Sequence, residues 1–162
     1  MNNNPQSASA HRGSATGAHP FNWEKMAILY ARIALGIGFL SGIADRFGLW
    51  RGRNVGYGNF DGFIHYTAKV NSFMPASTIP FLAWAATVAE LALGILLVIG
   101  LWPHWTALAS ALLLALFGVA MAVSFGLKSP LDYSVFSASA AALLLALYQG
   151  RTESVATNGK TT

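Results

Sequence analysis

The chain has 162 residues, of which 54% are hydrophobic and only 10% are charged, and its formal net charge is +4 at pH 7. Since soluble domains are roughly 25% charged, this composition argues against an ordinary soluble fold and indicates a single membrane domain. The absence of cysteine excludes disulfides, thiol chemistry and thiolate metal sites in this chain, and the basic residues are too scattered for a nucleic-acid-binding patch.

The two ends of the sequence are polar and lack hydrophobic periodicity. Residues 1–20 are rich in Asn, Ser, Ala and Gly and lack the apolar core of a signal peptide. Residues 151–162 form a similar short tail. We expect both tails to be disordered, on either side of a membrane domain over residues 21–150.

Four apolar segments follow one another within this domain. A helix needs about 20 apolar residues to cross the hydrocarbon core of a bilayer. A soluble protein with four such helices would have almost no polar surface left to face water. The sequence therefore predicts an all-α integral membrane protein, a bundle of four transmembrane helices at about residues 26–45, 79–102, 105–127 and 131–148.

The first predicted span is rich in glycine. Gly38 and Gly42 form a GxxxG pattern, and Gly36 precedes it. Small residues let two helices approach closely in lipid. We therefore interpret these glycines as packing positions.

A long connection, residues 49–78, separates the first two spans, and loops of this length are often functional. Within it, Phe60–Phe73 carries apolar residues at roughly helical spacing, with charged and polar residues between them. We expect a short interfacial helix here, lying on the bilayer surface. Pro75 and Pro80 then mark the start of the second span.

The later connections are short. Residues 101–105 leave room only for an antiparallel hairpin between the second and third spans. Before the fourth span, Ser129, Pro130 and Asp132 are spaced as in a helix start. Ser129 would be the N-cap and Asp132 would reach back to it.

Four ionisable residues in or beside the spans form the candidate site. Glu90 lies about midway along the second span, Arg32 about two turns into the first, and Asp45 and Arg46 at the far end of the first. Ionisable side chains at membrane depth are costly and normally face partners in the bundle interior. We expect a polar network in which Glu90 contacts Arg32 on one side and Arg46, directly or through water, on the other.

This network has two interpretations. It is either a buried ion pair that fixes the register of the helices, or the polar core of a ligand pocket that opens toward the long loop. A carboxylate in such a pocket would suit proton relay. The candidate residues at the mouth of the pocket are Tyr57, His65, Tyr66 and Tyr133.

No catalytic residue or metal site is assigned. The sequence has no recognisable nucleophile with its base, phosphate-binding loop or dinucleotide motif. None of its four histidines lies in a predicted span, which argues against a haem held within the membrane.

A set of charged and glycine residues occurs at characteristic places in the first two predicted spans, within a stretch of roughly residues 26–148. The set consists of Arg32, Gly42 with Arg46, Glu90, and Gly94 with Gly100. In this arrangement the chain resembles the DoxX family of small four-helix bacterial membrane proteins. The family includes DoxD, the small membrane subunit of an archaeal thiosulfate:quinone oxidoreductase.

The resemblance implies a quinone-linked or accessory membrane subunit of an oxidoreductase complex. It implies a place in the bacterial inner membrane with both tails in the cytoplasm, an orientation that the nearly even division of basic residues does not decide. Quinone is the implied cofactor, with no other in this chain. The implied partners are the lipid bilayer and a partner protein of the redox complex, or a second copy of the chain.

Two alternatives to this function stay open. The chain could be a small transporter or lipophile-binding carrier that uses the same pocket. It could also be a membrane anchor or assembly subunit without chemistry of its own.

Overall fold

The computed structural model describes residues 22–52 and 55–158, with side chains up to residue 152. The described chain is helical and contains no strand, which confirms the all-α prediction. In chain order the elements are α1 (Trp23–Arg46), α2 (Phe60–Val70), the 3-10 turn η1 (Ala76–Thr78), α3 (Ile79–Ile99), α4 (Pro103–Phe125), α5 (Lys128–Asp132) and α6 (Val135–Asn158).

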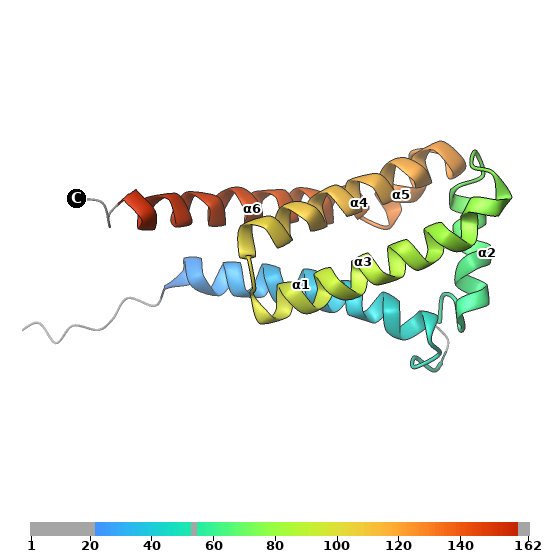
Figure 1. The fold of residues 1–162 in the computed structure, drawn as a ribbon, viewed down its shortest axis with the longest axis horizontal. Coiled ribbons are helices and arrows are strands. Elements are labelled where there is room, and N and C mark those ends of the chain that lie inside the picture. The colour runs from blue at the N-terminus through green and yellow to red at the C-terminus, as the bar shows by residue number, and fades with distance from the viewer. Residues whose placement is uncertain (1–21, 53–54, 159–162) are drawn as a thin grey trace, which may run out of the picture.

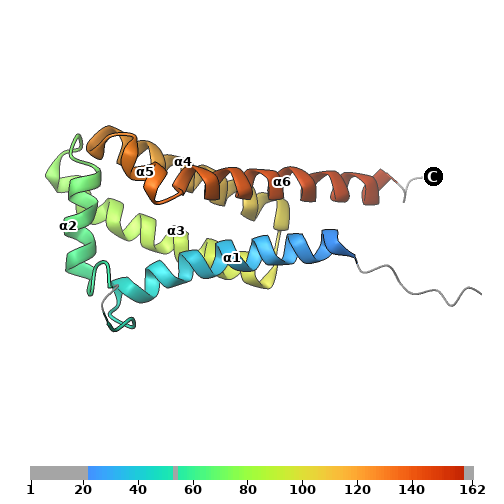
Figure 2. The ribbon, with the colours of Figure 1, turned by 180° about the vertical axis from the view of Figure 1, so that it is seen from behind.

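The four long helices lie lengthwise in a bundle, and α2 crosses one end of it (Figure 1). Helix α1 packs mainly on α3, and α4 packs mainly on α6. We call the end covered by α2 the loop end, and the end where α1 begins and α6 finishes the terminal end (Figure 2). A small apolar core joins the long helices and consists of Phe39, Leu97, Ala107, Leu145 and Ala146.

Three helical segments of the described chain are long and apolar enough to cross a membrane, namely Trp23–Arg46, Ala76–Ile99 and Pro103–Phe125. Their outer faces carry large apolar side chains such as Phe81, which is 74% exposed. Helix α6 is not among the three, because its second half contains Gln149 and Arg151. It nevertheless runs beside α4 and leaves Leu144 68% exposed, and the fourth span stays a prediction.

The predicted start of the fourth span at Ser129 is wrong. Ser129 lies inside the separate helix α5, which has no side-chain cap. Asp132 forms an ion pair with Lys128, one turn earlier, and caps nothing. Ser134 then adopts a left-handed backbone conformation with φ of 55°, and α6 begins only at Val135.

The helix expected for the fourth span also continues beyond residue 148. Helix α6 continues to Asn158, so the first part of the expected C-terminal tail is helical. The expected N-terminal tail, residues 1–20, and residues 159–162 lie outside the described residues.

The close approach of α1 to α3 depends on Gly36. A methyl group added at Gly36 would lie 2.8 Å from Val98 Cγ2 and 3.0 Å from the backbone oxygen of Gly94. A methyl group added at Gly38 would have no neighbour within 4 Å. Helix packing therefore depends on Gly36 and Gly94 rather than on the Gly38 position of the GxxxG pattern.

The short helix predicted in the long connection is present as α2. The Asn59 side chain caps its start by accepting a hydrogen bond of 2.8 Å from the Gly62 amide. One face of α2 buries Phe63, Thr67 and Val70, and the helix packs on α3 and α4. An amphipathic helix in this position covers the loop end of the bundle, as an interfacial helix does.

Candidate functional site

An ion pair between Arg46 and Glu90 lies beneath α2, at the loop end of the bundle. Arg46 is the last residue of α1, and Glu90 lies about midway along α3. Arg46 Nη2 is 2.6 Å from Glu90 Oε1, and the two residues are 4% and 5% exposed. The expected contact between these residues is therefore confirmed, and it is direct.

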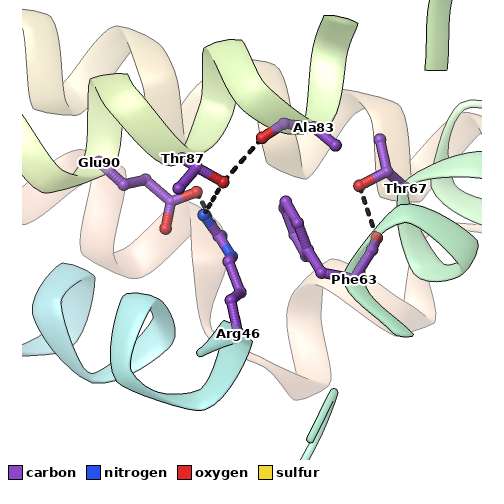
Figure 3. Close-up of polar contacts among 6 residues, drawn as sticks. All are labelled: Arg46, Phe63, Thr67, Ala83, Thr87 and Glu90. Atoms are coloured by element: carbon purple, nitrogen blue, oxygen red, sulfur yellow. Dashed lines mark hydrogen bonds and ion pairs between the residues drawn. The ribbon is translucent and has the colours of Figure 1, made fainter. Parts of the chain in front are cut away.

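Further groups surround the Arg46 guanidinium (Figure 3). Nη1 donates a hydrogen bond of 3.1 Å to Thr87 Oγ1, whose hydroxyl donates in turn to the Ala83 carbonyl. The Phe63 ring covers the guanidinium, with its centroid 3.6 Å from Arg46 Cζ, a favourable cation–π position. Nε of Arg46 is buried and has no hydrogen-bond partner within the described chain.

The second carboxylate oxygen of Glu90, Oε2, is turned toward helix α1. Among the described residues, no group donates a hydrogen bond to Oε2, since the contact with Arg46 uses Oε1. Gly42 of α1 faces this oxygen, and a methyl group added there would lie 3.5 Å from it. The absence of a side chain at Gly42 therefore keeps the surroundings of Oε2 open.

A cavity of about 330 Å³ adjoins Gly42 on the loop side. Trp50 closes one side of it, and its indole nitrogen donates to the Ser41 backbone oxygen at 3.1 Å. Gly42 lies between this cavity and the Glu90 carboxylate, since it lines the cavity and faces Oε2, whereas Glu90 is not among the lining residues. The lining residues are Ser41, Gly42, Asp45, Trp50, Arg51 and Val55.

Asp45 organises the loop beside this cavity. Its carboxylate accepts hydrogen bonds from the backbone amides of Gly56, Tyr57 and Gly58, at 2.8, 3.1 and 3.4 Å. Three amide donors satisfy a carboxylate well without a cationic partner. Asp45 thus lines the cavity and fixes the loop, and its contacts are with backbone amides rather than with the ion pair.

Arg32 lies near the terminal end of the bundle, away from Glu90. Its Nε donates to the Leu97 carbonyl at 3.1 Å, and its Nη2 donates to the Val98 carbonyl at 3.4 Å. These carbonyls belong to the last turn of α3, which carries the negative end of the helix dipole. The predicted contact between Arg32 and Glu90 is therefore wrong, because the end of α3 satisfies Arg32.

Three of the four residues predicted at the pocket mouth come together at the loop end. Tyr57 packs edge-on against Phe63, and its ring centroid is 5.2 Å from that of Tyr66. Burial raises the pKa of the Tyr57 hydroxyl, and the neighbouring Tyr66 raises it further. Burial also raises the pKa of Tyr66, with a smaller contribution from nearby Tyr133. His65 is exposed on α2.

Sequence reasoning missed several residues of this site. Thr87 lies three residues before Glu90, so the two share one face of α3, and this spacing could have indicated it. Phe63 belongs to the amphipathic stretch that predicted α2, but its position over a cation has no sequence signal. Trp50 and Ser41 come together only through the fold of the loop.

The DoxX family model matches residues 27–125, which is more than half of the chain. The match runs from α1 to the end of α4 and includes both members of the ion pair, whereas α6 lies beyond it. No curated protein and no solved structure matches the chain.

Proposed function

The chain belongs to the DoxX family, and we propose that it is a membrane subunit of an oxidoreductase complex that binds a quinone at Glu90. The observation that carries the proposal is that only one of the two carboxylate oxygens of Glu90 has a partner in the described chain. Glu90 Oε1 is paired with Arg46, while Oε2 faces Gly42, a residue that also lines the adjoining cavity.

Two unpartnered polar atoms of the ion pair fit the chemistry of a quinone. A quinol hydroxyl needs an acceptor, which Glu90 Oε2 offers. A quinone carbonyl needs a donor, and Arg46 Nε is a buried donor without a partner in the described chain. A buried donor left unpaired costs about 1–3 kcal/mol, so a ligand that used it would recover part of this cost.

The size and surroundings of the cavity also support a small ring. Its volume of about 330 Å³ is at the lower end of the range of roughly 300–1,000 Å³ seen for small-molecule sites. Trp50 is the aromatic residue of the cavity lining, and an indole ring suits contact with a flat ligand.

A bound quinone would supply coupled transfer of electrons and protons. The part of this chain is to hold the ring, with Glu90 accepting a hydrogen bond and handling the proton while Arg46 balances its charge. In this proposal the electrons pass to or from a redox group on a partner chain. This chain has no cysteine to hold an iron–sulfur cluster or form a redox disulfide.

A second candidate is an anchor or assembly subunit in which the ion pair only fixes the helices. The burial of the pair under Phe63 favours it, since both residues are almost fully enclosed. In that case the free oxygen of Glu90 would have no ligand. The transporter alternative stays a prediction, with no structural feature that favours it over these two.

The test is to purify the chain from its native membranes in a mild detergent and to identify bound quinone and partner chains by mass spectrometry. We expect wild-type protein to retain both. The variant Glu90→Gln should lose quinone about tenfold or more, the worth of one hydrogen bond to a charged group. Asp132→Asn, which alters an exposed carboxylate on α5, is the matched control and should keep it.

A second pair of variants tests the route through Gly42. Gly42→Leu should fill the gap beside Glu90 Oε2 and exclude the quinone, whereas Gly38→Leu places the same side chain in open space one turn earlier. If Glu90→Gln and Gly42→Leu both retain quinone, the site is not at Glu90. If the wild-type protein carries a partner chain but no quinone, the anchor function is correct.

A further inference from the structure

A second hollow lies between α1 and α6 near the terminal end of the bundle, far from the ion pair. This groove has a volume of about 530 Å³. It arises where three alanines, Ala27 and Ala31 of α1 and Ala141 of α6, leave space between the two helices. Its other lining residues are Ile28, Leu144, Leu145, Leu147, Tyr148 and Arg151. Apart from Tyr148 and Arg151 at one end, the lining is apolar.

The length of the groove matches one leaflet of a bilayer. From Ala141 to Arg151 the lining extends over ten residues of α6, which is about 15 Å at 1.5 Å per residue. This is half of the hydrocarbon thickness of about 30 Å. Trp23, the first residue of α1, is 77% exposed at the terminal end of the bundle, the end where α6 also finishes, as expected for an aromatic residue at the interface. In a bilayer crossed by α1 and α6, a groove of this length would reach from headgroup level to about the middle.

The charge at the mouth of the groove favours a phosphate. Arg151 is exposed there, and Lys25 and Glu24 lie in the first turn of α1 nearby. Two cations and one carboxylate give these three side chains a net charge of +1. The Glu24 carboxylate lies against the Tyr148 hydroxyl, on the α1 side of the mouth.

We propose that this groove is a lipid site, which holds one acyl chain of an anionic phospholipid between α1 and α6 while Arg151 binds its phosphate. The site is independent of the quinone function proposed above. A helix of a second copy fits less well, because a transmembrane helix needs the full membrane thickness and the groove covers half of it. A basic residue at headgroup level attracts anionic lipid.

The test uses native mass spectrometry of the full chain, exchanged in detergent against phosphatidylglycerol of defined acyl length. Wild-type protein should retain one phosphatidylglycerol molecule. Arg151→Gln should weaken its retention about fivefold, as expected for one basic residue at a membrane surface. Ala141→Phe should fill the groove and abolish retention. Ala140→Phe is the matched control, because Ala140 is the exposed neighbour of Ala141 outside the groove, and it should behave as wild type.

Three outcomes would overturn the proposal. If lipid retention is unchanged in both Arg151→Gln and Ala141→Phe, the lipid binds elsewhere. The same conclusion follows if retention is lost equally in Ala140→Phe. If wild-type protein is a dimer that Ala141→Phe converts to a monomer without any lipid loss, the groove is occupied by a second copy. The circular dichroism spectrum and thermal midpoint of each variant establish that it is folded, and Arg151→Gln alters an exposed side chain that the fold does not need.

Discussion

The two arginines of α1 satisfy their charge in different ways at the two ends of the bundle. At the loop end, Arg46 is buried and pairs with Glu90. At the terminal end, Arg32 is half-buried and donates to two carbonyls in the last turn of α3. Free carbonyls at a helix end can hold a guanidinium without any acid. A carboxylate in the middle of a span has no such substitute, so Glu90 needs Arg46 more than Arg32 needs a counter-ion.

The largest expected effect breaks the pair at the loop end. Glu90→Leu leaves Arg46 as a buried charge without a partner and should cost about 3–5 kcal/mol of folding free energy. The double variant Arg46→Leu with Glu90→Leu removes both charges and should recover most of this loss. Unfolding in mixed micelles, followed by circular dichroism, measures the difference. Should the single and double variants be equally stable, the pair contributes nothing to the bundle.

The second effect concerns the contact between α1 and α3 that brings both arginines to α3. Gly36→Ala places a methyl group 2.8 Å from Val98 Cγ2 and 3.0 Å from a backbone oxygen. Overpacking of this kind costs about 1–3 kcal/mol. Gly38→Ala adds the same atom in open space and should be neutral or slightly stabilising, since alanine is the better helix former. Equal thermal midpoints for the two variants would contradict the close approach at Gly36.

The third effect tests the terminal end. Arg32→Gln removes two hydrogen bonds to the end of α3 and should cost about 1–2 kcal/mol, less than the loss of Glu90. Arg32→Lys keeps a cation near the same carbonyls and should restore part of the loss. The same unfolding measurement applies to both. A cost for Arg32→Gln as large as that of Glu90→Leu would show that the two ends do not differ as described.

Composition and hydrophobic length were enough to predict the class of fold. Runs of apolar residues placed α1, α3 and α4, and helical spacing in the long connection placed α2. The start of α6 was not predictable in the same way. Residues 129–132 have the composition of a helix start, but the left-handed backbone of Ser134 ends α5 and shifts the long helix by one turn.

Within the candidate site, the sequence alone was likewise not enough to predict which arginine pairs with Glu90. Axial register places Arg32 closer to Glu90 than Arg46, whereas side-chain direction favours Arg46, because side chains lean toward the start of their own helix. In the structure, the direction of the side chains outweighs the axial register of the helices, and Arg46 forms the ion pair with Glu90. The contacts of Asp45 with three loop amides depend on the path of the loop, which periodicity does not describe.

The smallest effect sharpens the comparison through pH, since Tyr57 and Tyr66, two half-buried tyrosines whose pKa values are raised by burial, lie at the loop end. The pKa of Tyr57 is raised above its ordinary value of 10.0 by burial, so the folded state holds the phenolic proton more tightly than the unfolded state. This contribution to stability is complete below pH 10 and is lost as the pH rises toward the folded pKa. At about pH 10.5 the loss should be less than about 1 kcal/mol. Tyr57→Phe should remove it and flatten the alkaline fall in stability relative to wild type, while Tyr30→Phe, at an exposed position on α1, controls for the substitution itself. An alkaline slope that Tyr57→Phe leaves unchanged would mean that Tyr57 is not enclosed beneath the loop.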